Sequence, residues 1–215
     1  WWGGAELAVK TLNMNLDLDI TKYISLSFEA LEHMVDAVGG VDVELTEAEI
    51  WDITSRGVTL QNNGAGTYHL NGAQALGYCR VRSVDDDYSR MERQNIVMKA
   101  VMTELKHMSP LRMVDVIDEV LPYAETNLSN SDIRNYLITA ILANLDHIET
   151  YQLPENGMDD VAAILSYGGY SPLYKLKSYS DMIRNLHMFI YNDKNYQVST
   201  QALEIEQRIY DWFGY

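Results

Sequence analysis

The sequence predicts an α/β fold, in which helices pack on a β-sheet, and three observations support this class. Residues 28–38 carry apolar side chains at the spacing of one helix face, and two glycines stop the helix at 39–40. The next residues, VDVEL at 41–45, alternate apolar and acidic side chains as a half-buried strand does. Residues 20–27 precede the helix and are rich in β-forming residues, so they predict another strand. Strand–helix–strand units of this kind are typical of α/β proteins.

Apolar periodicity, capping residues and helix breakers predict the other elements. Capping boxes formed by Thr46 with Glu49 and by Ser89 with Glu92 each indicate a helix start, and Pro110 stands where a helix tolerates proline. Further helices are expected at residues 5–16, 46–57, 72–78, 89–108, 110–121, 131–145, 178–190 and 200–213. Short strands are expected at 58–60, within a glycine-rich loop, and at 147–153, whereas 155–172 shows no interpretable pattern.

Composition and charge limit the function classes. With 215 residues, 47% of them apolar, the chain is long enough for one globular domain over residues 1–215. Sixteen Lys and Arg against 31 Asp and Glu give a net charge of −15, so most of the surface repels nucleic acid and any phosphate site must be local. Nucleic acid is therefore not an expected partner. Cys79 is the only cysteine and is expected to be a small buried residue rather than a nucleophile.

The chain opens with WWGGAEL, without an initiator methionine and without a signal peptide. We therefore interpret it as a fragment that lacks its N-terminal strands and membrane anchor. Its longest apolar run, at 136–145, is far shorter than the roughly 20 residues that a membrane span needs. No role is assigned to the C-terminal portion at 155–215.

Four of the nine arginines lie within the segment 71–106, at Arg80, Arg82, Arg90 and Arg93. Arg80 and Arg82 are two residues apart, so their side chains share a side only in an extended segment. The helix that precedes them is therefore expected to end by Cys79. Holding two guanidinium groups about 6 Å apart at an effective dielectric of about 20 costs on the order of 3 kcal/mol, so an anion is expected beside them.

The second arginine pair is expected at the start of the next helix. Arg90 and Gln94 are four residues apart on one helix face, which Val97 and Val101 continue into the core, whereas Arg93 points elsewhere. A helix N-terminus offers free N–H groups, and an arginine fork grips two phosphate oxygens at once. The two converging pieces would thus suit a diphosphate.

The acidic residues of the same segment allow a different interpretation. Asp85, Asp86, Asp87 and Glu92 match the four arginine charges, so the segment could be a surface ion-pair network that contributes little. Spacing alone supports both interpretations equally. Asp85 and Asp87 could orient the arginines or accept a proton from an attacking hydroxyl, although loop and helix-start roles are commoner for such residues.

Two stretches resemble motifs of the LytR-CpsA-Psr (LCP) family. The run LNGAQALGYCRVRSVDDDYSRMERQ resembles the family's "eAL-x-Y-x-R-x-R" segment followed, after an acidic loop, by "D-x-x-R-x-x-R/N-Q". Upstream, GGAELAVKTLNMNL and VGGVDVEL resemble "GG-x-E-L-x-x-x-T-(V/L)-N" and "(L/V)-x-G-G-V-(D/E)-V". The resemblance covers about residues 3–106, the C-terminal two-thirds of the family's domain, and weakens beyond 108.

The resemblance implies a three-layer α/β/α fold with a central mixed or antiparallel sheet flanked by helices and an apolar lipid pocket. It implies a membrane-anchored phosphotransferase on the extracytoplasmic face, which moves a polyprenyl-diphosphate-linked glycopolymer, such as teichoic acid or capsular polysaccharide, onto peptidoglycan. The residues to which it assigns diphosphate binding are Arg80, Arg82, Arg90 and Gln94, with Arg82 and Arg90 catalytic and Asp85 and Asp87 in support. Candidates for the lipid pocket, most of them equally suited to the core, are Ile24, Leu26, Phe28, Leu31, Met34 and Val35.

The family resemblance also implies Mg²⁺ as a cofactor. The metal-binding aspartates and a further arginine of the family lie upstream of its GG-x-E-L motif, so no metal ligand is expected in this sequence and no catalysis from it alone. Two alternative functions remain. One is a hydrolase that releases lipid phosphate with water as the acceptor. The other is a non-catalytic lipid-phosphate-binding or regulatory domain, since many LCP proteins were first labelled transcriptional regulators or attenuators.

Overall fold

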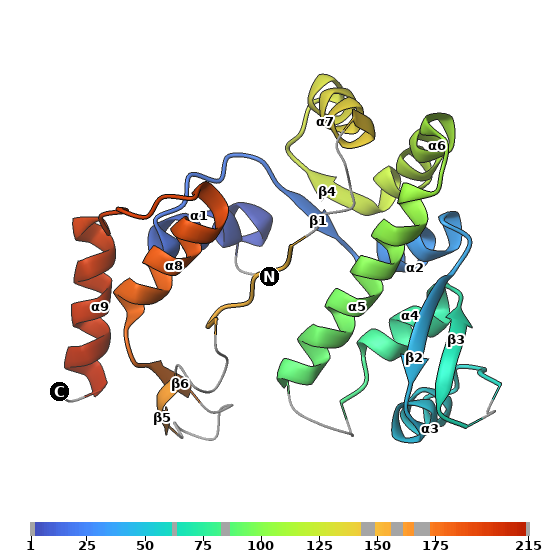
Figure 1. Cartoon of the computed structure of the whole chain (residues 1–215), viewed down its shortest axis with the longest axis horizontal. Helices are drawn as coiled ribbons and strands as arrows, with labels where there is room; N and C mark the ends of the chain where they lie inside the picture. Colours follow the sequence, from blue (N-terminus) through green and yellow to red (C-terminus); the bar gives the residue numbers. More distant parts are fainter. Residues whose placement is uncertain are drawn as a thin grey trace. The chain divides into compact units, whose positions relative to one another are not determined.

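The structure, a computed structural model, describes residues 3–61, 64–82, 87–142, 149–155, 161–165 and 173–213 (Figure 1). The chain divides into two compact units. Unit 1 combines the two ends of the chain, Trp1–Tyr23 and Ile148–Tyr215, and unit 2 is the continuous stretch Ile24–His147. All of the predicted site residues belong to unit 2. The single domain expected over residues 1–215 stays a prediction.

Unit 2 alternates short strands with helices in the order typical of an α/β protein. Its elements are β1 (Ile24–Leu26), α2 (Phe28–Ala37), β2 (Val41–Leu45), α3 (Glu47–Ser55), β3 (Gly66–Leu70), α4 (Gly72–Cys79), α5 (Asp87–Lys106), α6 (Pro110–Val120), the 3-10 helix η1 (Leu121–Tyr123), β4 (Ala124–Thr126) and α7 (Asn130–Leu142) (Figure 1).

The strands of the described residues pair in twos, and every pair is antiparallel. In unit 2, β1 pairs with β4 and β2 pairs with β3, with Val43 opposite Tyr68. In unit 1, β5 (Val161–Leu165) pairs with β6 (Leu173–Leu176). The alternation predicted for VDVEL is confirmed, because the side chains of β2 are alternately buried and exposed.

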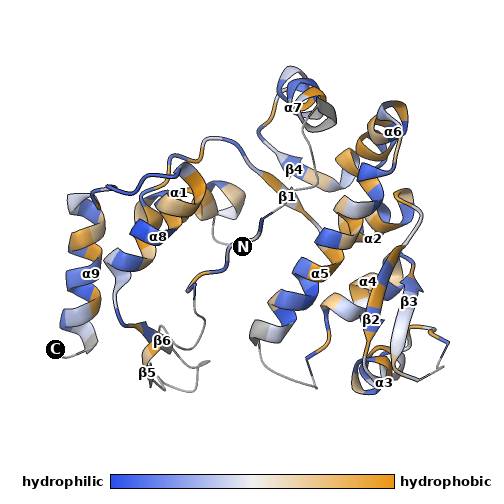
Figure 2. Cartoon of the chain, in the orientation of Figure 1, coloured by the Kyte–Doolittle hydropathy of each residue, from blue (hydrophilic) through white to orange (hydrophobic). Residues whose placement is uncertain are grey.

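The core of unit 2 lies where α2, α4 and α5 cover the β2–β3 pair. Val41 and Leu70 from the two strands are completely buried, and so is Val35 from α2. Hydrophobic and hydrophilic residues alternate along β2 (Figure 2). From α5, Val97 and Val101 are also completely buried, which confirms the predicted inward stripe. Each such valine stabilises the fold by roughly 1.5–3 kcal/mol relative to an exposed one. The first turns of α5 are thereby fixed relative to α4, which is the part of the fold that holds the predicted site.

Unit 1 is held by contacts between the two ends of the chain. Besides β5 and β6 it contains α1 (Gly4–Leu16), α8 (Tyr179–Tyr191) and α9 (Thr200–Phe213). All residues of α1 are described, and none of them is buried. The Tyr179 hydroxyl donates to the carbonyl of Asn15 at 2.6 Å, and the backbone N–H of Ser199 donates to Asp17 Oδ2 at 2.7 Å. These two bonds tie the end of α1 to the C-terminal helices.

Glu206 of α9 caps the start of α8. Its Oε1 accepts from the backbone N–H groups of Tyr179 and Ser180, each at 3.0 Å, and the hydroxyl groups of Ser180 and Tyr210 also donate to this carboxylate. Burial alone would raise the pKa of Glu206, but these hydrogen bonds outweigh it and hold the pKa below its ordinary value.

Several predicted boundaries are wrong for identifiable reasons. The strand expected at 20–27 shrinks to β1, because only residues 24–26 find a partner in β4. Residues 58–60 are not a strand, since the carbonyl of Thr59 accepts from the side chain of Gln74 at 2.8 Å. The glycine-rich segment expected to be a loop contains β3 instead, because its residues 66–70 pair along the whole of β2.

The helix start predicted at Ser89 is also wrong. The helix begins two residues earlier, at Asp87, so Ser89 lies in its first turn and cannot be its N-cap. The strand expected at 147–153 is absent from its described part, 149–153, and residues 147–148 lie outside the described residues. By contrast, the capping box of Thr46 with Glu49 is confirmed, as is Pro110 at the start of α6. None of the helices in the described ranges combines the length and the apolar content that crossing a membrane requires.

Candidate functional site

The site is built on the C-terminus of α4. A capping box fixes the start of this helix, because Asn71 Oδ1 accepts from the N–H of Gln74 at 3.0 Å and Gln74 Oε1 accepts from the N–H of Asn71 at 3.0 Å. The helix ends at Cys79, as predicted, and Arg80 is its C-cap. The chain therefore leaves the helix at the first arginine of the Arg-x-Arg pair.

Burial alternates along this exit segment. Val81 is completely buried, whereas Arg80 and Arg82 are exposed. Both arginines are therefore exposed on either side of a buried residue. The extended conformation expected for the Arg-x-Arg segment is wrong at Arg80, because this residue is the C-cap of α4 and has φ −104° and ψ 1°. Among the described residues, neither Arg80 nor Arg82 forms an ion pair with a carboxylate.

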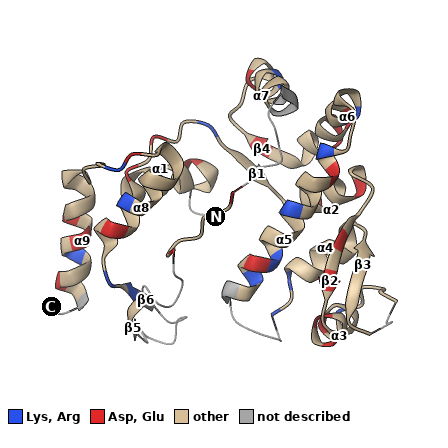
Figure 3. Cartoon of the chain, viewed as in Figure 1, with Lys and Arg blue, Asp and Glu red and all other residues tan. Residues whose placement is uncertain are grey.

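Arg93 connects this segment to α5. Its side chain is 3% exposed, its Nη2 donates to the carbonyl of Val81 at 3.0 Å, and its Nη1 lies 3.4 Å from Glu49 Oε1. Arg90 and Gln94, both half-buried, lie on the same first turns of α5. The structure therefore brings the peptide between the two exposed arginines against the helix start that carries Arg90 and Gln94. Basic and acidic residues lie close together on these turns (Figure 3).

A second arginine contacts the same segment from α3. Arg56 is the C-cap of α3, and its Nη1 donates to the carbonyl of Arg80 at 3.0 Å. The other side of the guanidinium meets Asp52, with Nε 2.6 Å from Oδ1 and Nη2 3.1 Å from Oδ2. Asp52 is 1% exposed.

Glu49 lies one helical turn before Asp52 on α3 and is 8% exposed. Its Oε2 accepts from the backbone N–H and from the hydroxyl of Thr46, both at 2.9 Å, which caps α3. Its Oε1 faces Arg93. One carboxylate therefore joins the start of α3 to α5.

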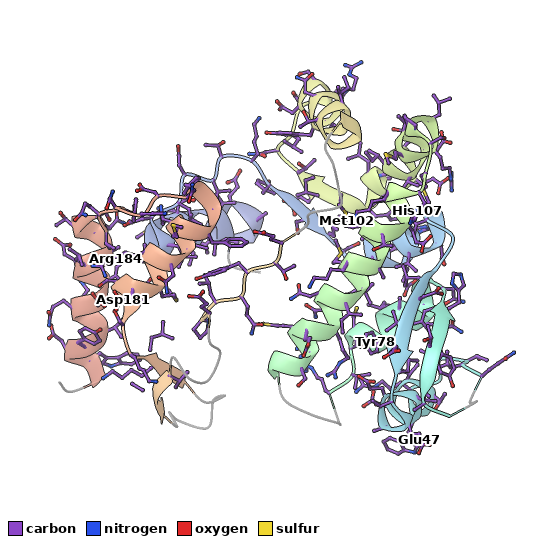
Figure 4. All side chains as sticks on the ribbon, viewed as in Figure 1. Glu47, Tyr78, Met102, His107, Asp181 and Arg184 are labelled. Carbon is purple, nitrogen blue, oxygen red and sulfur yellow. The ribbon has the colours of Figure 1, made fainter. Side chains whose placement is uncertain are left out.

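Two ionisable groups between these elements are neutral core residues. Tyr78, labelled in Figure 4 where α4 approaches α5, is buried, and burial together with the negative charge of Glu49 raises its pKa to about 12. Burial raises the pKa of Cys79 to about 11, although the positive charge of Arg93 acts in the opposite direction. Cys79 is thus a protonated, buried thiol, which confirms its prediction as a structural residue.

Beside the arginines lies an apolar edge of unit 2. The guanidinium carbon of Arg80 is 5.3 Å from the ring centroid of Phe28, a cation–π distance. Phe28 is 62% exposed, and Ile24 and Leu26 of β1 are 58% and 40% exposed. Of the lipid-pocket candidates these three are thus at the surface, whereas Val35 is completely buried in the core.

The remaining predicted residues are only partly described. Asp85 lies outside the described residues, and Asp87 is the first residue of α5 but its side chain is not described. The competing interpretation, in which these carboxylates neutralise the arginines, therefore stays open. Sequence reasoning missed Asp52 and Arg56 altogether and assigned Glu49 only a capping role; the Thr46–Glu49 box was the sole signal for it.

The described residues form no metal-binding cluster at this site. In the described ranges, no three His, Cys, Asp or Glu side chains gather as the ligands of a metal ion would. No Mg²⁺ ligand is therefore assigned among the described residues. An open hollow of about 510 Å³ lies beside β3, lined by residues between Leu60 and Gln74, and includes none of the predicted diphosphate ligands.

Comparison with known proteins decides the family. The LytR_cpsA_psr family model matches residues 2–202 of the chain. The chain belongs to the LytR-CpsA-Psr family. The match reaches almost a hundred residues beyond 106, where the recognisable motifs end, so α8 and the start of α9 are part of the LCP sequence pattern as well.

Curated relatives support the same assignment. The chain is 34% identical over 164 residues to Biofilm regulatory protein A of Streptococcus mutans, covering 72% of this chain and 39% of that protein. It is 31% identical over 157 residues to the polyisoprenyl-teichoic acid–peptidoglycan teichoic acid transferase TagT of Bacillus subtilis, covering 71% and 47%. The chain thus spans about half, or less, of the lengths of these LCP relatives.

Solved structures show that the fold is that of LCP proteins. A structure of TagT bound to LIIa-WTA is 27% identical with a TM-score of 0.68, and the match covers 91% of this chain and 69% of that one. The crystal structure of B. subtilis TagT is 26% identical over the same shares, with a TM-score of 0.67. The predicted LCP-type α/β fold class is therefore confirmed.

Proposed function

We propose that the intact protein transfers a glycopolymer from a polyprenyl diphosphate to peptidoglycan, on the outer face of the bacterial membrane. The observation that carries the proposal is the junction of α4 with α5. There, exposed Arg80 and Arg82 flank a buried peptide that is hydrogen-bonded to the helix start bearing Arg90 and Gln94. The name of the TagT relative, a teichoic acid transferase, supports the substrate class.

The proposed ligands suit a diphosphate on chemical grounds. Guanidinium groups bind phosphate oxygens in pairs of parallel hydrogen bonds, and their positive charges offset the charge that develops during phosphoryl transfer. In the proposed reaction a peptidoglycan hydroxyl attacks the sugar-side phosphorus and releases its proton to water. The bridging P–O bond breaks, and polyprenyl phosphate leaves with the electron pair. Arg82 and Arg90 would hold the oxygens of the phosphorus under attack, and Arg80 and Gln94 those of the leaving phosphate.

The apolar edge supports a lipid-linked substrate. Phe28, Ile24 and Leu26 place exposed apolar surface next to Arg80, so one ligand could contact a charged and an apolar region together. A polyprenyl diphosphate has this combination, whereas a free sugar phosphate or a nucleotide has no apolar chain.

The proposal is tested by binding and turnover of the full-length protein. We expect Arg82→Ala and Arg90→Ala each to weaken the affinity for geranylgeranyl diphosphate, measured by calorimetry, by about 10- to 100-fold, since a charged hydrogen bond contributes roughly 1.5–3 kcal/mol. Arg134→Ala is the matched control, because Arg134 is an exposed arginine on α7 of the same unit. Unchanged affinity in both site variants would refute the site.

Turnover separates transfer from hydrolysis. With a lipid-linked teichoic acid precursor, we expect product only when a peptidoglycan acceptor is added. Release of polyprenyl phosphate at the same rate without an acceptor would identify a hydrolase, and binding without any release would identify a lipid-phosphate-binding domain.

A further inference from the structure

Two arginines that are not among the proposed ligands contact the backbone of the Arg-x-Arg segment. Arg56 donates to the carbonyl of Arg80 and Arg93 donates to the carbonyl of Val81, both at 3.0 Å. Each of these carbonyls lies just beyond the C-terminus of α4, where the helix provides no N–H partner. Two consecutive peptide groups are therefore held by guanidinium groups from different elements.

Each of these guanidinium groups is anchored by a buried carboxylate of α3. The carboxylate of Asp52 contacts two nitrogens of Arg56, Nε and Nη2. Oε1 of Glu49 lies 3.4 Å from Nη1 of Arg93. Asp52 and Glu49 are three residues apart, so both project from one face of the helix. Helix α3 is in turn capped by Glu49 through Thr46. Through these two arginines, the carbonyls of Arg80 and Val81 are both held in place by the same helix, α3.

The geometry separates two classes of arginine. Arg56 and Arg93 have carboxylate partners, so their charges are already balanced and they direct their remaining donors at the backbone. Among the described residues, Arg80 and Arg82 have no carboxylate partner and their side chains are exposed. Since the bonded peptide groups flank Val81, fixing their planes fixes the directions in which the Arg80 and Arg82 side chains leave the chain. Side chains that are already held in position bind a diphosphate more tightly, because they lose less conformational freedom on binding.

We propose that Arg56 and Arg93 are positioning residues for the diphosphate: through the carbonyls of Arg80 and Val81 they hold the Arg80 and Arg82 side chains in binding geometry. This inference rests on the proposed function, because it requires that Arg80 and Arg82 bind the diphosphate. The fork of arginine is essential to the role, since lysine keeps the charge but cannot direct rigid donors at a carboxylate and a carbonyl together.

The test is the affinity of the full-length protein for geranylgeranyl diphosphate, with folding checked by circular dichroism. We expect Arg93→Lys and Arg56→Lys each to weaken binding by about tenfold while the charge is kept, the loss of about one well-oriented charged hydrogen bond. Arg112→Lys is the matched control. Arg112 makes the same kind of contact elsewhere in unit 2, donating to the carbonyl of Ala37 at 2.7 Å and to Glu119 at 3.3 Å. The affinity of the Arg112→Lys variant for geranylgeranyl diphosphate should equal that of the unmodified protein.

A double-mutant cycle distinguishes positioning from general damage. If Arg93 acts through Arg82, adding Arg93→Lys to the Arg82→Ala variant should weaken binding further by less than about threefold, because the side chain that Arg93 positions is already gone. An undiminished tenfold loss in that background would overturn the positioning role, as would normal binding by both lysine variants while Arg82→Ala binds weakly. If Arg93→Lys does not fold, Arg56→Lys decides alone, since the Arg56 side chain is 40% exposed and its replacement disturbs the core less. Unchanged binding by Arg82→Ala and Arg90→Ala refutes the proposed function itself, which is a separate outcome.

Discussion

Replacing Glu49 with glutamine isolates the charge that faces Arg93. Glutamine has nearly the same shape and can still complete the capping box with Thr46, so the helix start is kept. What is lost is the negative charge that Glu49 places beside Arg93, whose side chain is 4% exposed against 11% for that of Glu49. Breaking a buried pair in this way costs about 3–5 kcal/mol. Because the two atoms are 3.4 Å apart and Arg93 keeps its bond to Val81, we expect the lower end, about 3 kcal/mol.

The assay is urea and thermal unfolding of the 215-residue chain. A loss of about 3 kcal/mol should lower Tm by roughly 6–12 °C for a protein of this size. Thr46→Ala is the control, because it removes one member of the same capping box without touching Arg93 and should cost only about 1 kcal/mol. If Glu49→Gln destabilises no more than Thr46→Ala, the carboxylate acts only as a cap and the reasoning about its second oxygen is wrong.

Two further predictions concern other contacts. Gly72→Ala should destabilise the protein by about 1–3 kcal/mol in urea unfolding, because a Cβ there would lie 2.3 Å from the carbonyl oxygen of Glu32, and backbone cannot yield as a side chain does. Gly77→Ala in the same helix meets only side chains, at 3.3 Å or more, and an equal loss there would contradict this explanation. Since hydrogen bonds such as those from Ser180 hold the pKa of Glu206 below its ordinary value of 4.5, its stabilising contribution is present above about that pH and is lost as pH falls through the lowered pKa. The stability difference between the unmodified chain and Glu206→Gln should therefore be largest near neutral pH and shrink in acid; a constant difference would refute it.

Much of the fold follows from local signals in the sequence. The alternation in β2, the capping box at Thr46 and the end of α4 at Cys79 each depend on residues within a few positions of one another. The inward stripe of Val97 and Val101 is a periodicity of the helix that bears it. Such short-range signals can be recognised in a single sequence because the residues that determine each element lie within it or next to it.

The errors arise where distant residues decide. Gly66–Leu70 is glycine-bounded and polar, and becomes a strand only because β2 provides a paired edge more than twenty residues upstream. The positioning contacts join Arg56 to Arg80 across 24 residues and Arg93 to Glu49 across 44. The sequence pattern at the arginines predicts that the preceding helix ends by Cys79, as it does, but the carbonyl groups that Arg56 and Arg93 contact carry no residue identity. Contacts to backbone are therefore the part of the site that sequence reasoning could not reach.

The division of the chain into a continuous unit and a split unit has a consequence for the order of folding. Unit 2 has all of its residues as soon as position 147 has been synthesised. The bonds that hold α1, from Asn15 to Tyr179 and from Asp17 to Ser199, span 164 and 182 residues. They cannot both form until position 199 has been synthesised. Helix α1 precedes unit 2 in the chain and yet finds these partners only after all of unit 2 has been synthesised.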